Sequence, residues 1–312
     1  MQVHHSIKSF AKKTYTTILT IGVFDGVHIG HQKVIETLNT NKADSSSALF
    51  TFFPHPRRVL NANNDLRMLT TIEEKIQLLE KFGLDILIIE PFTDEFSDLP
   101  PRDFVKNLLV EKLHVKKLVI GYDHRFGKDR KGDFDQLQRF SKEFGFEVEE
   151  ISAQEMEDVA VSSTKIRKAL EEGEIEKANK YLGYNYLLTG KVVTGIGLGR
   201  KINFPTINIS IDDEQKLIPK NGVYIVRTKI NQNNVFGIMN IGFRPTVDGK
   251  HKTIEVHLLD FNGNLYDEEL QIEILKRLRE EQKFESVEAL TLQIKKDEEK
   301  ARDWIITEKF LK

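Results

Sequence analysis

The sequence predicts an α/β domain with a doubly wound, Rossmann-like parallel sheet, followed by a small antiparallel β-barrel with a C-terminal helix. In the first half, short apolar runs alternate with amphipathic helical patterns. After about residue 180, strand-like runs follow one another closely between glycine, asparagine and proline residues. The length of 312 residues fits about two domains. We expect these domains at residues 1–182 and 183–312.

Five apolar runs of the first half are typical of strands that are buried on both faces of a parallel sheet. They cover residues 17–24, 48–53, 85–90, 117–122 and 146–151. Between them, Thr71-Ile72-Glu73-Glu74 is a capping box that opens a helix, and residues 102–113 and 133–144 also have helical patterns. Sheets of this class bind ligands beyond the carboxyl ends of their strands. Motifs at strand ends are therefore the candidate sites.

The second half predicts strands at residues 187–193, 222–230, 235–241, 253–260 and 269–276, with a turn at residues 240–246. A final helix should pack on the barrel through an apolar stripe. The stripe comprises Phe284, Val287, Leu290, Ile294, Ala301, Trp304 and Ile305. The charged run 295–300 is expected to be its solvated face, and residues 171–185 are the candidate hinge between the domains.

Composition excludes several classes of protein. Lys and Arg number 46 against 48 Asp and Glu, and 30% charged with 39% hydrophobic residues is typical of a globular chain rather than a disordered or membrane-spanning one. The near-neutral balance lacks the basic field of a nucleic-acid binder. No cysteine is present, which excludes thiolate nucleophiles and cysteine-based metal sites. We expect a cytoplasmic protein with small-molecule partners, no nucleic-acid or membrane partner, and either a monomeric or a weakly oligomeric state.

The segment Gly22-Val23-Phe24-Asp25-Gly26-Val27-His28-Ile29-Gly30-His31 leaves the first strand and enters the first predicted helix. Gly26 and Gly30 let the backbone approach a ligand closely, while His28 and His31 share one face of the first helical turn. The helix N-terminus adds free N–H groups, so the combination favours an anion. A bare His-x-x-His is more often two surface histidines, but the strand-to-helix context favours the anion site. A zinc site would need a third ligand.

Three further segments follow later strands of the same sheet. Residues 51–58 present His55 and Arg57 after a rigid proline turn. Residues 121–127 carry Asp123 and Arg125, and residues 161–167 begin a helix with hydroxyl groups and cations. Each segment alone is equally typical of a helix cap or a surface charge. Together at one edge of one sheet they predict a polyphosphate site.

In order and spacing, the segments GVFDGVHIGH, TFFPHP, GYDHRFG and VSSTKIR resemble the adenylyltransferase domain of bacterial bifunctional FAD synthetases, over about residues 16–180. The resemblance implies transfer of AMP from ATP to the phosphate of FMN, giving FAD and pyrophosphate. It implies that His28 and His31 bind the phosphates and stabilise the transition state. The further contacts it implies are Gly22, Phe24, Asp25, Gly26, Ser163, Thr164 and Arg167 to ATP and its phosphates, and His55, Arg57, Asp123 and Arg125 to FMN and the nucleotide. One departure is His124, where the family usually has phenylalanine.

A second candidate site begins at residues 194–200, where glycine stands at every second position before Arg200. Such a loop can lie against phosphates, although the glycines alone are more typical of a plain hairpin loop. Thr206 and Asn208 alternate along one strand face and offer two oxygen ligands to a hard cation such as Mg²⁺. Glu255, in an alternating strand, can accept a proton from an alcohol during phosphoryl transfer or simply pair with Arg244.

These segments resemble the riboflavin kinase domain of the same bifunctional enzymes, over about residues 185–310. The family fold is a six-stranded barrel with a C-terminal helix. The resemblance implies that Glu255 is the general base on the ribityl hydroxyl of riboflavin and that Arg279 borders the flavin. The nucleotide contacts it implies are Gly195, Gly197, Gly199, Arg200, Thr206 and Asn208, of which Thr206 and Asn208 would coordinate Mg²⁺.

Two positions depart from the kinase pattern, because Asn203 and Asp267 stand where the family typically has glycine. If these positions need a positive φ angle, asparagine is the least costly substitute for glycine and aspartate is also tolerable.

The resulting prediction is a transferase with two activities, a riboflavin kinase and an FMN adenylyltransferase. Riboflavin, FMN, FAD and ATP would be its substrates and products, and Mg²⁺ its cofactor. One alternative is a FAD synthetase whose barrel binds flavin but has lost its kinase activity, although intact Thr206, Asn208 and Glu255 argue against it. Others are a non-enzymatic flavin or nucleotide sensor, and an adenylyltransferase for a nicotinamide or pantetheine phosphate. Turnover of ATP and a screen of acceptors distinguish them.

Overall fold

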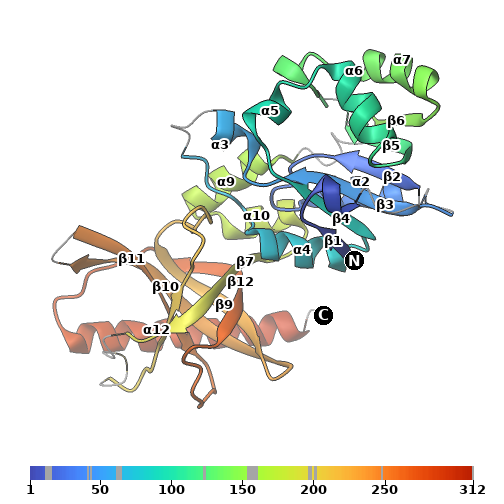
Figure 1. The fold of residues 1–312 in the computed structure, drawn as a ribbon. Helices are drawn as coiled ribbons and strands as arrows, with labels where there is room; N and C mark the ends of the chain where they lie inside the picture. Colours follow the sequence, from blue (N-terminus) through green and yellow to red (C-terminus); the bar gives the residue numbers. More distant parts are fainter. Residues whose placement is uncertain are drawn as a thin grey trace. The chain divides into compact units, whose positions relative to one another are not determined.

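The computed structural model describes residues 1–312 except 11–15, 41, 43, 61–64, 122–123, 153–160, 196–198, 200–201, 247–248 and 311–312. The chain forms two compact units, Met1–Ser163 and Thr164–Lys312 (Figure 1). The first contains a parallel sheet and the second a closed antiparallel barrel, so the predicted fold class is confirmed. No helix within the described ranges is both long enough and apolar enough to cross a membrane.

The first unit is built on a six-stranded sheet in the order β1-β4-β3-β2-β5-β6, in which every neighbouring pair is parallel. Its strands are β1 Gln2–His4, β2 Thr17–Ile21, β3 Ser46–Phe52, β4 Ile86–Glu90, β5 Val115–Gly121 and β6 Glu147–Ile151. The five predicted strands are confirmed. The edge strand β1 was not predicted, because three residues without an apolar run carry no periodic signal.

The described helices of the first unit are α1 Ile7–Phe10, α2 Ile29–Thr40, α3 Pro56–Leu60, α4 Ile72–Lys81, α5 Asp94–Ser97, α6 Pro101–Asp103, the π-helix η1 Phe104–Val110, the 3-10 helix η2 Lys128–Arg130 and α7 Phe134–Phe144. The capping box of α4 is confirmed, since Thr71 and Glu74 each accept a hydrogen bond from the other's backbone N–H. Asp133 caps α7. The helix predicted over residues 102–113 is largely a π-helix, whose wider turns keep its apolar residues in the core.

The connections of this sheet reverse direction between β2 and β5. From β2 the chain runs through β3 to β4 on one side, and then crosses to β5 and β6 on the other side. The carboxyl ends of β2, β3 and β5 therefore meet at a topological switch point, where sheets of this class bind their ligands. The predicted motifs that follow these three strands lie at this edge.

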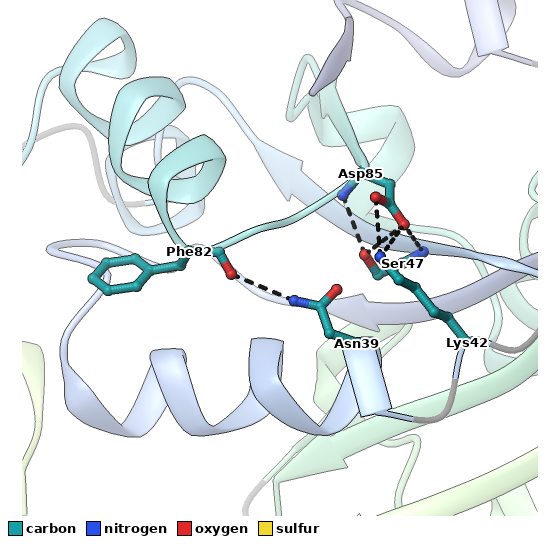
Figure 2. A network of polar contacts seen from close by, with 5 residues as sticks. All are labelled: Asn39, Lys42, Ser47, Phe82 and Asp85. Atoms are coloured by element: carbon teal, nitrogen blue, oxygen red, sulfur yellow. Dashed lines mark hydrogen bonds and ion pairs between the residues drawn. The ribbon is translucent and has the colours of Figure 1, made fainter.

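A polar network closes the opposite edge of the sheet, where β3 and β4 begin (Figure 2). The Asp85 carboxylate accepts hydrogen bonds from Lys42 Nζ at 3.0 Å and from the backbone N–H of Ser47 at 3.0 Å. Ser47 Oγ also bonds to Asp85, and Asn39 Nδ2 donates to the carbonyl oxygen of Phe82. Partial burial opposes ionisation of Asp85, but the bonds from Lys42 and Ser47 outweigh it and hold its pKa below the usual value.

We expect Asp85→Asn to destabilise this edge by about 1 kcal/mol near pH 7, a small value because exposed ion pairs are screened by solvent. The side chain of Asp85 is 38% exposed. Because its pKa is lowered by folding, its contribution is present above the unfolded pKa of about 3.9 and is lost as the pH falls through the folded pKa. Hydrogen–deuterium exchange of β3 and β4 amides should differ between variant and parent near neutral pH and converge in acid.

The second unit begins with two helices and continues into the barrel. The helices are α9 Ser163–Glu172 and α10 Ile175–Leu182, and the strands are β7 Tyr186–Val193, β8 Ile207–Ser210, β9 Gly222–Ile230, β10 Asn233–Thr246, β11 Gly249–Leu258 and β12 Glu269–Arg279. The barrel closes in the order β10-β11-β8-β7-β12-β9. The turn predicted at residues 240–246 is wrong, because β10 continues through it and pairs with β11 to its end.

The segment at residues 171–185, expected to be a hinge, is mostly the helix α10. The amide of Asn179 bonds to the carbonyl oxygen of Ile274 at 2.8 Å and accepts from the N–H of Tyr186 at 2.8 Å, so α10 is fixed to β12 and β7. These contacts join α10 to the barrel, in agreement with its place in the second compact unit.

The C-terminal helix α12, Val287–Phe310, runs along the outside of the barrel (Figure 1). Ala301 and Ile305 pack on β9 and β10, as predicted, whereas Val287 is 48% exposed and does not belong to the core. The charged run 295–300 is not simply a solvated face. Its Asp297 is buried and accepts hydrogen bonds from Arg279 Nε and Nη2 at 2.9 and 2.8 Å. Asp297 is buried although its neighbours in the run are charged, because its partner Arg279 lies on β12.

Both departures from the kinase pattern have positive φ angles, 62° at Asn203 and 68° at Asp267, as expected. Asparagine and aspartate tolerate this region, whereas a β-branched residue is strained there by about 1–3 kcal/mol. We therefore expect Asn203→Gly to change the thermal midpoint very little and Asn203→Val to lower it clearly. Equal midpoints for the two variants in calorimetry would contradict this explanation.

Candidate active sites

The segment that follows β2 places three rings in a stack at the switch point. His28 and His31 have ring centroids 3.7 Å apart with an 18° angle between the planes, and Phe24 lies 4.3 Å from His31 at 19°. His28 is 5% exposed and Phe24 6%. The predicted pairing of the two histidines is therefore present, and both belong to the loop and first turn that open α2.

Main-chain groups of a neighbouring segment hold this loop. The Asp25 carboxylate accepts hydrogen bonds from the N–H groups of Leu69 and Thr70, at 3.0 and 3.3 Å. The N–H of Gly26 donates to Thr70 Oγ1 at 3.3 Å, and Ser163 Oγ donates to the carbonyl oxygen of Asp25 at 2.9 Å. In this arrangement the buried Asp25, predicted to contact the nucleotide, fixes the shape of the loop.

The surroundings of His31 oppose its protonation. Burial, the neighbouring His28 and the ammonium group of Lys75 together hold the pKa of His31 well below its usual value of 6.5. The negative charge of a bound triphosphate would act in the opposite direction and favour the imidazolium form of His31.

The other predicted residues of the first site lie in the segments after β3 and β5. His55 Nδ1 accepts from the N–H of Arg57 at 3.0 Å, and Arg57 is exposed on α3. Arg125 forms an ion pair with Asp133 at 3.4 Å, and the ring of His124 is stacked 6.3 Å from that of Phe126. Asp123 lies outside the described residues. Thr164 and Arg167 belong to α9 in the second compact unit.

The second site gathers oxygen-bearing side chains on the outer face of the barrel. In the strand register, Glu255 on β11 stands between Asn208 on β8 and Asn240 on β10. Val256, which points the other way, is fully buried, while Glu255 is half-buried. The predicted base therefore lies next to one of the two predicted metal ligands.

Two glycines of the predicted phosphate loop, Gly195 and Gly199, closely approach the same region. A Cβ atom on Gly195 would clash with the side-chain amide of Asn208, and one on Gly199 would clash with the carbonyl oxygen of Phe204 and lie 3.3 Å from Thr206 Oγ1. His257 Nδ1 contacts the carbonyl oxygen of Pro205 at 2.8 Å, which ties the segment before Thr206 to β11. Gly197 and Arg200 lie outside the described residues.

Arg279 is committed to a structural pair. Besides the two bonds to Asp297, its Nη1 donates to the carbonyl oxygen of Glu280 at 2.9 Å. In the register Arg279 pairs with Val223, which pairs with Asn240 beside Glu255. Around the closed barrel, Arg279 on β12 is therefore three strands away from Glu255 on β11. Its bonds to Asp297 hold α12 against the barrel.

The sequence reasoning missed Lys75, Thr51 and Asn240, which lie at the two sites. Lys75 is 2% exposed, and its Nζ donates to the carbonyl oxygen of Val23 at 2.8 Å. A signal was present, because Lys75 shares the buried face of α4 with Leu78 and Leu79 at helical spacing. Asn240 was missed because residues 240–246 were expected to form a turn, whereas Asn240 lies within β10 and pairs with Glu255.

No group of three or more histidine, cysteine, aspartate or glutamate side chains in the described part of the chain can hold a metal ion. The donors at the second site are instead a hydroxyl, an amide and one carboxylate. Such a set suits a magnesium ion that takes most of its ligands from phosphate oxygens and water.

Comparisons with known proteins agree with this division into two sites. A family model described as FAD synthetase matches residues 10–165, and one described as riboflavin kinase matches residues 182–305. Three curated relatives carry the name bifunctional riboflavin kinase/FMN adenylyltransferase. The relative from Listeria monocytogenes is 39% identical over 304 residues, 96% of each chain. Those from Bacillus subtilis and Escherichia coli K12 are each 37% identical, over 96% and 92% of this chain and 94% and 92% of their own.

A solved structure has the same fold over the full length. The crystal structure titled macrolide-efflux protein from Streptococcus pneumoniae superposes with a TM-score of 0.87 at 30% identity, covering 97% of this chain and 98% of its own. That similarity covers both the parallel sheet and the barrel.

Proposed function

Because this chain belongs to the family of bifunctional riboflavin kinase/FMN adenylyltransferases, we propose that each compact unit performs one of the two reactions. The second unit phosphorylates riboflavin to FMN with ATP, and the first transfers AMP from another ATP to that FMN, giving FAD. The main support for this assignment is that each unit has its own candidate phosphate-binding site. In the first it is the stacked His28–His31 pair at the switch point, and in the second it is the glycine loop against Thr206 and Asn208.

In the first unit, an FMN phosphate oxygen attacks the α-phosphorus of ATP in line with the departing pyrophosphate. The new P–O bond joins the two phosphates of FAD, while the bond from the α-phosphorus to the bridging oxygen breaks and its electrons leave with pyrophosphate. His28 and His31 stabilise the negative charge that develops there, and Ser163, whose Oγ lies beside the loop at Asp25, would help to hold the leaving group. Positioning and charge stabilisation suffice for this chemistry, so the enzyme supplies no nucleophile.

In the second unit, Glu255 accepts the proton of the ribityl hydroxyl as that oxygen attacks the γ-phosphorus of ATP, and ADP leaves. The neighbouring Asn240 is placed to orient the hydroxyl, because it lies beside Glu255 in the register. Thr206 and Asn208 would hold Mg²⁺, which supplies positive charge on the phosphate oxygens when bound. The close approach of Gly195 and Gly199 to these side chains supports a nucleotide lying under the loop.

Three narrower proposals accompany this function. The functional division stays at residues 182 and 183, with α9 and α10 joined to the barrel by packing. The ligands are small molecules, with neither a nucleic-acid nor a membrane partner, and the chain acts in the cytoplasm. The alternative of an inactive barrel is disfavoured by the assembled Thr206, Asn208 and Glu255.

The test is a chromatographic time course. Purified protein is incubated with riboflavin, ATP and Mg²⁺, and in parallel with FMN, ATP and Mg²⁺, and the three flavins are resolved over time. We expect FMN and then FAD in the first reaction and FAD in the second. FAD from FMN with riboflavin left untouched would refute the kinase assignment, and no flavin turnover in either reaction would refute both.

A further inference from the structure

The carbonyl oxygen of Val23 receives two side-chain hydrogen bonds. Lys75 Nζ on α4 donates to it at 2.8 Å, and Thr51 Oγ1 on β3 donates at 3.2 Å. Both donors are buried, with exposures of 2% and 0%. Burying an ammonium group whose hydrogen bond goes to a main-chain carbonyl rather than to a carboxylate is costly, so its presence next to a candidate active site needs a reason.

The loop after Val23 contains two residues with strained backbone conformations. Phe24 and Val27 have φ angles of 52° and 37°, in the left-handed region that non-glycine residues rarely adopt. Each such residue costs about 1–3 kcal/mol and persists only where the surroundings fix it. Phe24 stacks on His31, and Val27 directly precedes His28. The strained residues therefore set the positions of both histidine rings.

Lys75 also adds a fixed charge beside these rings. Burial lowers the pKa of Lys75, and the carboxylate of Asp25 opposes that effect. The charge is felt at His31, where burial, His28 and Lys75 all act against protonation. On the loop and on α4, His28 and Lys75 are the titratable groups that act on His31, and Asp25 acts on Lys75.

We propose that Lys75 is a positioning residue of adenylyl transfer. It holds the Val23 carbonyl so that the strained loop presents His28 and His31, and it supplies positive potential beneath the phosphates of ATP. The proposal rests on the proposed adenylyltransferase function of the first unit. It assigns to Lys75 two separable effects, one on loop geometry and one on the charge at the histidine pair.

The experiment compares Lys75→Met, Thr51→Val and the control Lys33→Met. Lys75→Met keeps the unbranched side chain up to the Cε atom but removes the ammonium group and with it both effects. Thr51→Val removes one bond to Val23 and leaves the charge. Lys33 lies on α2 with an exposed side chain paired to Glu36, outside the site. FMN adenylylation is measured against ATP concentration across pH, and riboflavin phosphorylation by the same preparation reports whether the protein is folded.

We expect Lys75→Met to lower kcat/KM for ATP at least tenfold, mainly through KM, with riboflavin phosphorylation unchanged. The limb of its pH profile that reports the histidine pair should move to higher pH, because a neutral side chain no longer opposes protonation of His31. Thr51→Val should lower kcat/KM severalfold without moving that limb, and Lys33→Met should match the parent protein.

Two results would overturn the proposal: parental kinetics in Lys75→Met, or a lower melting temperature with an unmoved pH profile, which is the behaviour of a purely structural lysine. If Lys75→Met does not fold, Lys75→Arg decides. It should keep the pH limb but lose kcat/KM through altered geometry, and parental kinetics in both Lys75→Arg and Thr51→Val would refute the proposal. Failure of the parent protein to form FAD would instead refute the proposed function.

Discussion

His28→Ala should lower FAD formation by about 10²- to 10³-fold while FMN formation from riboflavin continues at the parental rate. This is the usual loss when one preorganised group that stabilises developing charge is removed. The effect should be large because His28 is buried and its ring is stacked on that of His31, with 3.7 Å between the ring centroids. In a buried position, water cannot easily take over the role of the missing imidazole. Initial rates of both reactions on one preparation give the measurement.

Two companion variants make that result specific. His5→Ala removes an exposed histidine of the same unit and should leave both reactions unchanged. Glu255→Gln should have the reciprocal effect, lowering FMN formation by about 10²- to 10⁴-fold through loss of the general base and sparing FAD formation from FMN. If either His28→Ala or Glu255→Gln stopped both reactions in a folded protein, the assignment of one reaction to each unit would be wrong.

The parts of the molecule that the sequence predicts are those governed by local patterns. The strands β2 to β6, the capping box at Thr71 and the glycine-histidine segment at the end of β2 all carry their signal within about ten consecutive residues. The positive φ angles of Asn203 and Asp267 agree with the expectation that rested on the family's glycines at these positions. The spacing of His28 and His31 predicted that they share a face but not that their rings stack.

The parts that escaped prediction depend on partners far apart in the chain. Lys75 lies 52 residues from Val23, so its helical spacing can indicate a buried face but not its partner. Asp297 lies 18 residues from Arg279, and its place in a run of charges does not indicate that it is buried. Asp25 was predicted to contact the nucleotide because it stands in the phosphate segment, whereas its carboxylate bonds to the main chain at Leu69 and Thr70. A charged residue in a binding motif can therefore stabilise the conformation of the motif as well as contact the ligand.

Asp297→Asn should destabilise the barrel by about 3 kcal/mol, because it leaves the Arg279 guanidinium buried without its counter-charge. The side chains of the pair are only 16% and 3% exposed, and Asp297 also accepts from Gln293 Nε2 at 2.8 Å. Trp304, the only tryptophan of the chain, lies on the same helix, so its fluorescence during urea unfolding reports the loss directly. Riboflavin phosphorylation should fall with it, since α12 packs on β10, the strand that carries Asn240 beside Glu255, while FMN adenylylation should persist.

A matched ion pair on α12 separates burial from charge in this prediction. Arg302 pairs with Asp260 at 2.8 Å, but those side chains are 41% and 75% exposed. Asp260→Asn should therefore cost less than about 1 kcal/mol, because solvent replaces the lost partner. Replacing both Arg279 and Asp297 by leucine should recover much of the stability that Asp297→Asn loses, since no uncompensated charge is then buried. Equal losses for Asp297→Asn and Asp260→Asn would mean that burial of the Arg279 pair contributes nothing to holding α12 on the barrel.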